Sequence, residues 1–191
     1  MTALELVQKI VKKNNKISKV SLFAYIYVPL QHEKSKLNHT IWMSRNDFLN
    51  SKKINQIIKA LPKDANVGVD SKVKTSDNKY YYLPMVDFGC KKSTKYINLI
   101  IERFKKEDIK HGWLVETAKS YHYYGDELLT YRQCIQFYGK CLCSSIVHTR
   151  ENIEQLADTR YIGHILRRGS STLRFTTNGD KTFEPKVVKS F

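Results

Sequence analysis

The apolar residues of this chain come in short segments whose spacing changes from that of a helix to that of a strand and back. Residues 3–13 (ALELVQKIVKK) place Leu4, Val7 and Val11 about one helical turn apart among lysines, which predicts an amphipathic helix. Residues 20–28 (VSLFAYIYV) are rich in β-branched and aromatic side chains, which is typical of a strand. Segments of both kinds follow one another without an internal repeat, so we expect an α+β fold for the 191 residues.

The remaining elements are predicted from the same two patterns, with proline and turn residues as boundaries. We expect strands at residues 39–43, 65–73, 80–88, 113–117, 121–124, 142–147 and 173–176, and helices at residues 54–61, 93–105, 126–138 and 153–166. Pro84 interrupts the segment 80–88, which predicts an edge strand, a strand start or a bulge. Residues 76–78 (SDN) form a turn motif. We place the boundary between two modules of one compact unit at this turn, which gives residues 1–78 and 79–191.

Lysine and arginine outnumber the acidic residues by 33 to 18, which gives a formal net charge of +15 at pH 7. Such an excess favours a polyanionic partner: nucleic acid, nucleotide phosphates or an acidic membrane surface. The longest apolar run, residues 20–30, is only about half of the roughly 20 residues that a membrane-spanning helix needs. The first residues also lack the apolar core of a secretory signal. We therefore expect a cytoplasmic protein without a membrane partner.

The 4 cysteines are too few for a disulfide scaffold. Cys134, Cys141 and Cys143 have the spacing C-x6-C-x-C, with His148 nearby. Structural zinc sites usually pair their ligands at shorter, regular spacing, so buried small residues are the favoured interpretation and a zinc site stays open.

Two short segments combine carboxylate, hydroxyl and imidazole side chains. In the first (MVDFG, 85–89), Asp87 ends an apolar strand, where its carboxylate can bind a divalent cation or cap the next helix. In the second (KSYHY, 119–123), Ser120 and His122 point to one face of an extended backbone. A hydroxyl beside an imidazole suits a triphosphate or an attacking hydroxyl, and an ordinary polar strand face has the same pattern.

A third segment, residues 156–182, is basic and rich in hydroxyl groups. It begins with Leu156-Ala157-Asp158, and its basic residues include Arg160, His164, Arg167, Arg168, Arg174 and Lys181. Alternating guanidinium and hydroxyl groups are typical of a phosphate-binding cradle, and a solvated basic surface is the alternative.

The order of these three segments resembles the archaeo-eukaryotic primase superfamily, the primase-polymerases. That family has a D-x-D motif at a strand end, an s-x-H motif on a strand, and a hydrophobic-D pair that precedes a basic segment. Here Asp87 matches the first motif, residues 120–122 (SYH) match the second and residues 157–158 (AD) match the third. The resemblance covers roughly residues 80–185. It implies a two-lobed core, in which an N-terminal α/β module and an RRM-like module enclose the site.

The resemblance also implies roles for single residues. Asp87, Asp158 and His122 would be the catalytic residues, and the two aspartates would hold Mg²⁺ or Mn²⁺. Nucleotide contacts would come from Lys119, Ser120, His122, Arg174 and Lys181, and nucleic-acid contacts from Arg160, Arg167 and Arg168. The implied function is binding of a nucleoside triphosphate with its metal and of single-stranded DNA or RNA, with template-dependent nucleotidyl transfer in priming. A separately encoded helicase or another replication or defence protein is the expected partner.

Gly89 stands where the family has the second aspartate of its first motif. Because glycine offers no side-chain oxygen, we expect a degenerate metal site, and the alternative function is a catalytically inactive nucleotide- or nucleic-acid-binding module of a replication or defence complex. A replication-initiator nuclease is another candidate, but its H-x-H metal motif is missing because position 120 is Ser. A basic interaction protein without a site is the last alternative, and its binding would depend on salt and ignore Mg²⁺.

Overall fold

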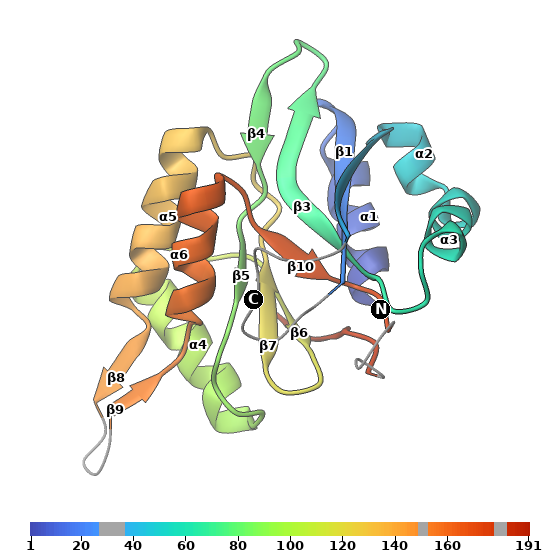
Figure 1. The fold of residues 1–191 in the computed structure, drawn as a ribbon. Helices are drawn as coiled ribbons and strands as arrows, with labels where there is room; N and C mark the ends of the chain where they lie inside the picture. Colours follow the sequence, from blue (N-terminus) through green and yellow to red (C-terminus); the bar gives the residue numbers. More distant parts are fainter. Residues whose placement is uncertain (27–36, 149–152, 178–182) are drawn as a thin grey trace.

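The computed structural model describes residues 1–26, 37–148, 153–177 and 183–191, and Figure 1 shows their fold. Helices and antiparallel strands are mixed along the chain, which confirms the α+β class. The predicted strand 20–28 corresponds to β1, and its last two positions fall outside the described residues. Among the described residues, no helix is both long and apolar enough to cross a lipid bilayer.

The first sheet is antiparallel and gathers strands from both halves of the chain. Its order is β10 (Thr172–Arg174), β3 (Asn66–Thr75), β1 (Ile17–Tyr25) and β2 (Asn38–Ser44), and β4 (Tyr80–Tyr82) also pairs with β3. β4 and β10 follow residue 78 in the sequence and still pair with β3. The division into modules 1–78 and 79–191 stays a prediction.

The second sheet is also antiparallel, and it holds most of the segments that the sequence marks for chemistry. Its order is β11 (Lys186–Ser190), β6 (Trp113–Glu116), β7 (Tyr121–Tyr124) and β5 (Met85–Asp87). A separate hairpin is formed by β8 (Ile146–His148) and β9 (Ile153–Gln155).

The prediction of one continuous strand over residues 80–88 is wrong, because the chain changes sheets at Pro84. β4 ends at Tyr82 in the first sheet, and β5 begins at Met85 in the second. The Leu83 N–H still donates to the Ser71 carbonyl of the first sheet at 2.8 Å, whereas the Pro84 carbonyl accepts from the Gly125 N–H beside the second sheet at 2.8 Å. Proline lacks an N–H and can therefore stand directly before a strand.

Helices cover the sheets on opposite sides of the molecule (Figure 1). α1 (Ala3–Lys13), α2 (Arg45–Leu49) and α3 (Ser51–Ala60) accompany the first sheet, and α4 (Thr94–Lys106), α5 (Tyr131–Cys143) and α6 (Thr159–Arg168) accompany the second. Ser44 and Asn50 accept hydrogen bonds from backbone N–H groups at the starts of α2 and α3. Such caps satisfy the N–H groups that a first helical turn leaves without partners.

Side chains of the second sheet alternate between two hydrophobic clusters. Val86, Leu114 and Tyr123 pack with α4, α5 and α6. Met85 and Tyr124 belong to the other cluster, together with α1 and one face of the first sheet. Because neighbouring residues of a strand point to opposite faces, this sheet separates the two halves of the core.

Three further predictions in the C-terminal half are wrong in part. The helix expected over 126–138 begins at Tyr131, because Thr130 and Gln133 form a capping box there, and it runs on to Cys143. The strand expected over 142–147 is reduced to β8, since α5 occupies its first positions. The helix expected over 153–166 is a strand, β9, followed by α6, which begins after Asp158. α2 and β11 were not predicted.

Two of the clustered cysteines pack in the core. Cys134 and Cys141 are buried on the inner side of α5, and burial raises the pKa of both thiols, to about 11 for Cys134. Cys143 is exposed. The favoured interpretation of buried small residues holds for the first two.

Candidate functional site

The backbone brings together the three motif segments that are far apart in the sequence. Asp87, the last residue of β5, lies directly opposite His122 of β7 in the strand register. On its other side, the Asp87 carbonyl accepts the Asp158 N–H at 3.0 Å, and the Gly89 N–H donates to the Leu156 carbonyl at 2.8 Å. The segment around Asp87 is therefore held between β7 and the start of α6.

Asp87 and His122 contact each other through their side chains. The Asp87 Oδ1 lies 3.6 Å from the His122 Nε2, and the side chains are 32% and 9% exposed. Burial, helped by the nearby charge of Arg174, lowers the pKa of His122 from 6.5 to about 3. The imidazole is thus neutral at pH 7, and this contact is not an ion pair. A distance of 3.6 Å is also longer than a hydrogen bond.

Arg174 reaches the same place from the first sheet. It is the last residue of β10, which packs beside β5, and it is 9% exposed. Its guanidinium donates to the Thr176 carbonyl. Burial lowers the pKa of Arg174, while the nearby Tyr25, Tyr124 and Asp87 oppose that shift. The buried Arg174 guanidinium therefore lies within electrostatic range of a carboxylate and a neutral imidazole.

Two buried polar atoms beside Arg174 have no hydrogen-bond partner among the described residues. They are the His122 Nδ1 and the hydroxyl oxygen of Tyr124. Burial raises the pKa of the Tyr124 phenol, and the nearby Asp87 adds to that shift. Most buried polar atoms in proteins are hydrogen-bonded, so two such atoms next to a buried cation suit a bound ligand that supplies oxygen atoms.

Sequence reasoning missed Tyr124 and Tyr25. Tyr124 lies two residues after His122 on the same strand, so it points to the same face, and the strand prediction for 121–124 contained the signal that could have found it. Tyr25 ends β1, a strand of the other sheet, and no local pattern links it to Arg174.

Asp158 lies beside Asp87 and also caps a helix. It is the N-cap of α6, and its Oδ1 accepts the Tyr161 N–H at 2.9 Å. Within the described part of the chain, no group of three or more His, Cys, Asp or Glu side chains is arranged to hold a metal ion. The donors at hand are therefore two carboxylates on adjoining backbone segments. Such a set fits Mg²⁺, which proteins usually bind through one or two carboxylates, with substrate phosphates and water completing the shell.

Gly89 leaves open space beside these carboxylates. It is exposed, and a Cβ built on it would meet no atom closer than 3.9 Å, the Cα of Asp158. A side chain at this position would therefore fit without displacing its neighbours.

The structure does not bring every predicted nucleotide contact to this place. Ser120 is buried just before β7, and its Oγ lies 3.9 Å from the Cys90 Sγ. Lys119 is exposed in the turn between β6 and β7. Lys181 lies outside the described residues.

The predicted nucleic-acid contacts lie along α6. Arg160 and Arg167 are exposed on this helix. Arg168 donates to the Ser170 carbonyl at 3.1 Å and to the Thr172 Oγ1 at 2.9 Å. These bonds hold Arg168 against the first sheet, so it is set apart from the other two.

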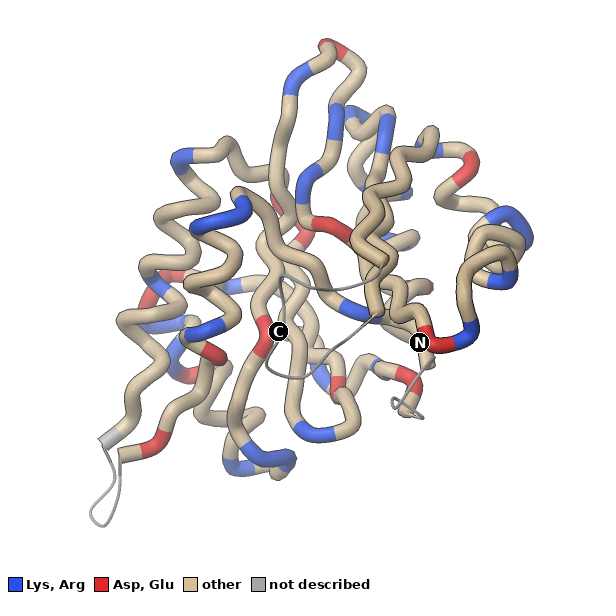
Figure 2. Tube along the Cα trace, viewed as in Figure 1, with Lys and Arg blue, Asp and Glu red and all other residues tan. Residues whose placement is uncertain are grey.

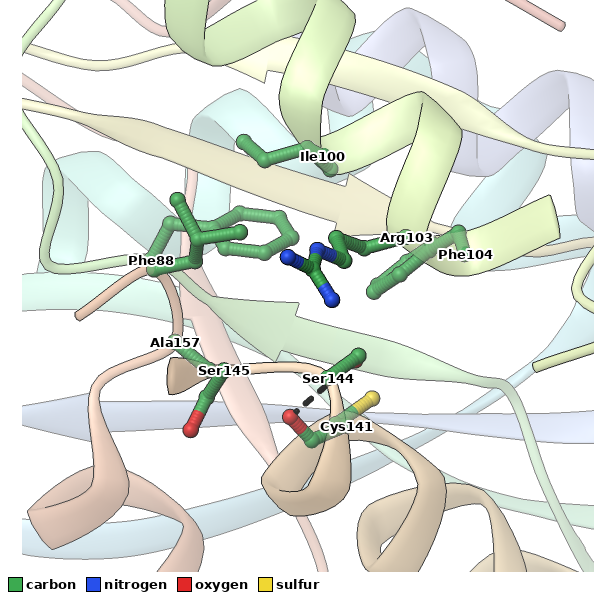
Figure 3. A pocket seen from close by; sticks show the side chains of 9 residues that line it. Phe88, Ile100, Arg103, Phe104, Cys141, Ser144, Ser145 and Ala157 are labelled. Carbon is green, nitrogen blue, oxygen red and sulfur yellow. Dashed lines mark hydrogen bonds between the residues drawn. The ribbon is translucent and has the colours of Figure 1, made fainter. Parts of the chain in front are cut away.

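A small apolar pocket lies on the helix-covered side of the second sheet (Figure 3). Phe88, Ile100 and Phe104 line it, and Arg103 extends its guanidinium into it. The pocket cannot admit even a water molecule. It belongs to the core beside α4 and α5, and it is not a candidate nucleotide site.

Comparison with protein families gives one finding that bears on these segments. A family model described as "AEP-like: Archaeo-eukaryotic primase 1D-like" matches residues 45–187. Searches among curated proteins and among solved structures gave no match. The matched residues make up well over half of the chain and include Asp87, His122, Asp158 and Arg174. The chain therefore belongs to the archaeo-eukaryotic primase-like family.

Proposed function

We propose that this primase-polymerase-like protein binds a nucleoside triphosphate, with a divalent cation, at the place where Asp87, His122, Asp158 and Arg174 converge. The observation that carries the proposal is the buried Arg174, which lies within electrostatic range of both His122 and Asp87 although it comes from the other sheet. A buried cation needs a compensating anion, and a phosphate group provides one.

The triphosphate would be held by Arg174, His122 and Tyr124, and the charge of Arg174 acts on both other side chains. The Arg174 guanidinium can donate two parallel hydrogen bonds to a phosphate. The neutral imidazole of His122 has one N–H, and the Tyr124 hydroxyl has one O–H. The His122 Nδ1 and the Tyr124 hydroxyl have no partner in the described part of the chain, so a phosphate oxygen would satisfy them without breaking a bond described there.

The metal would be held by Asp87 and Asp158. When bound, Mg²⁺ or Mn²⁺ neutralises triphosphate charge and activates an attacking hydroxyl. The chain's own contribution is to hold both carboxylates on backbone segments joined by the hydrogen bond from Asp158 to Asp87. Because the Asp158 Oδ1 already caps α6, we expect weak metal binding until a nucleotide supplies further oxygen ligands.

Gly89 would make this site a degenerate version of the family's metal site. With one carboxylate missing, the protein would bind the nucleotide and transfer it slowly, or bind it without reaction. Binding without reaction corresponds to an inactive binding module. This is the second candidate function, because Gly89 is exposed and leaves the space of the missing side chain empty.

The remaining assignments are part of the same proposal. Residues 1–78 would be the N-terminal module, and residues 79–191 would be the RRM-like module. Ser120, Lys119 and Lys181 would make secondary nucleotide contacts, and Arg160, Arg167 and Arg168 would contact single-stranded DNA or RNA. Cytoplasmic location, a role in priming, and a helicase or defence partner stay predictions.

Binding of labelled ATP and dATP, with and without Mg²⁺ or Mn²⁺, tests the proposal. The wild type is compared with Asp87→Asn, Arg174→Met and the surface control Lys52→Ala, and extension of a primed single strand is scored in the same samples. We expect metal-dependent binding that Asp87→Asn and Arg174→Met lose and the control keeps. Equal, metal-independent binding by all four proteins would contradict a nucleotide site here and would favour a basic surface that binds by charge alone.

A further inference from the structure

We propose that the face of the first sheet turned away from α1, here called the outer face, binds a single strand of nucleic acid by stacking its bases on exposed aromatic rings. This inference deepens the proposed function and rests on it in one respect: the bound strand would lead to the nucleotide site at Arg174. The binding itself needs neither nucleotide nor metal, so it can be tested separately.

The strand register puts aromatic and basic residues on the outer face. Lys19 of β1 lies opposite Lys74 of β3, and Lys74 lies opposite Tyr80 of β4. Phe23 and Tyr25 follow on the same side of β1, and Trp42 lies on that side of β2, opposite Ser21. The other side of these strands, with Val20, Leu22 and Val69, is buried against α1. The outer face therefore carries rings and lysines where a purely structural face needs only polar residues.

The rings of Trp42 and Tyr80 lie across the sheet. Their strands, β2 and β4, are separated by β1 and β3, yet the ring centroids are only 6.1 Å apart. Both residues remain 40% and 48% exposed. Two large rings that cover a strand surface and keep half of their area in solvent offer flat faces for stacking. Adjoining exposed rings of this kind, next to basic residues, are typical of a surface that binds a partner.

Two lysine side chains lie beside the Tyr80 ring. The Lys72 Nζ lies 4.3 Å and the Lys74 Nζ 5.6 Å from the centre of the Tyr80 ring. Figure 2 shows the basic residues along β3 where it approaches its turn into β4. A single strand needs this combination, because its bases stack on rings while its phosphates pair with neighbouring cations.

The outer face leads to the candidate nucleotide site. Phe23 lies opposite Gly68, and Gly68 lies opposite Arg174 on its other side. A second ring pair, Phe23 and Tyr25, has centroids 5.8 Å apart, and the Arg168 guanidinium lies 5.0 Å from the Phe23 ring. A strand that lies over Tyr80 and Trp42 can thus continue over Phe23 and Tyr25 to Arg174.

Charge on this face favours a polyanion. Among the described outward-facing positions of these strands, one residue is acidic: Asp70, whose side chain is buried. Its carboxylate accepts hydrogen bonds from the Ser170 hydroxyl at 3.1 Å and from the Lys72 N–H at 3.0 Å. The ring faces distinguish a nucleic acid from an acidic polypeptide, since only the former brings flat bases. They also favour a single strand over a duplex, whose bases are already stacked.

The test uses the whole protein in EDTA, without nucleotide. In a Trp113→Phe background, Trp42 is the remaining tryptophan, and its fluorescence is followed on addition of oligo(dT) or oligo(U) of about 15 nucleotides, within the usual range of site sizes. We expect strong quenching by either oligonucleotide and little by the matching duplex. Binding without quenching would overturn the proposal, because it would place the strand elsewhere.

Fluorescence anisotropy of a labelled oligonucleotide then measures affinity in variants of the outer face. We expect Tyr80→Ala, Trp42→Ala and the apolar replacement Trp42→Leu each to weaken binding by about 5- to 150-fold, the range that loss of one stacked base implies. Tyr131→Ala, which removes an exposed tyrosine of α5, is the matched control and should bind like the wild type. Trp42→Leu keeps the sheet covered, so its loss of binding is not a folding defect.

Two outcomes would overturn the inference. In one, the ring variants bind like Tyr131→Ala while Arg160→Ala and Arg167→Ala lose affinity, which would move the strand to α6. In the other, polyglutamate displaces the oligonucleotide at equal charge concentration, which would identify a surface for acidic polypeptides. Failure of the proposed function has a different signature: metal-dependent ATP binding is absent while the outer face still binds oligo(dT).

Discussion

Asp158 donates its backbone N–H to the carbonyl oxygen of Asp87 at 3.0 Å, and this bond, with the neighbouring one from Gly89 to Leu156, joins two motifs that the sequence places far apart. It aligns the start of α6 with the end of β5, beside the strand that carries His122. The residues that carry the two carboxylates are therefore neighbours across a backbone hydrogen bond. The distance between their backbone positions is set by this bond and not by the conformation of a loop.

Substitution of Arg174 should separate ligand binding from stability. We expect Arg174→Met to weaken metal-dependent ATP binding by about 10- to 150-fold, the range for loss of a hydrogen bond to a charged group. The thermal midpoint should stay the same or rise, because an apolar side chain of similar length replaces a buried cation that forms no ion pair with the described residues. Isothermal titration and thermal melts check both results, and a large fall of the midpoint with unchanged ATP affinity would contradict the assignment.

His122 should make stability depend on pH in the acid range. Its pKa of about 3 in the folded protein lies below the ordinary value of 6.5, so the unfolded chain binds the extra proton between these values. Above about pH 6.5, His122 is neutral in both the folded and the unfolded chain, and its contribution to the free energy of unfolding is fully present. As the pH falls towards 3, the free energy of unfolding decreases by up to about 1.4 kcal/mol per pH unit. Urea unfolding between pH 4 and 7 should show a shallower dependence for His122→Asn than for the wild type. Parallel curves would contradict a buried neutral imidazole.

Addition of a carboxylate at position 89 should strengthen the metal site. The open space there accommodates Asp, so Gly89→Asp should fold normally and raise Mn²⁺-dependent primer extension by at least about tenfold, since metal catalysis supplies several kcal/mol of transition-state stabilisation. Gly139→Asp on α5, where a Cβ meets nothing within 4 Å, is the charge-matched control. If both variants behave alike, Gly89 does not stand in a metal site.

The two tasks of Asp158 can be separated by two substitutions. Asp158→Ala should cost about 0.5–2 kcal/mol of stability because it removes the cap of α6, whereas Asp158→Asn should keep most of that stability. Both should weaken Mg²⁺-dependent ATP binding, since neither retains a charged carboxylate. Chemical denaturation combined with ATP titration measures the two effects, and full ATP affinity in Asp158→Asn would exclude this residue from metal binding.

The hydroxyl of Tyr124 should matter for the ligand and not for the fold. Tyr124→Phe removes a buried oxygen that has no partner among the described residues, so stability should be unchanged or higher. ATP binding should weaken by about 2- to 13-fold, the value of one ordinary hydrogen bond. Thermal melts and ATP titration of this variant provide the check, and a destabilised protein with normal ATP affinity would show that the hydroxyl has a structural role instead.

The helices and strands could be predicted from the sequence where a segment keeps the same neighbours along its whole length. The predicted helix at 3–13 is α1, whose apolar spacing matches the single face that it buries. The predicted strand at 121–124 is β7, whose aromatic residues suit a strand that is buried on both faces. The same reading failed at 80–88 and 153–166. There the chain changes partners, at Pro84 and at the Asp158 cap, and apolar spacing does not record which sheet a residue joins.

Residue types and local spacing were enough to predict the α+β class, the basic charge and the order of the Asp87, His122 and Asp158 segments. The position of Arg174, within electrostatic range of His122 and Asp87, became visible in the folded chain. Arg174 lies on a short strand that pairs with β3 of the other sheet, where burial lowers its pKa. The pKa of His122 is lowered by its own burial and, to a smaller extent, by the charge of Arg174. Contacts between strands distant in sequence are set by packing of the whole core, and no window of sequence contains them.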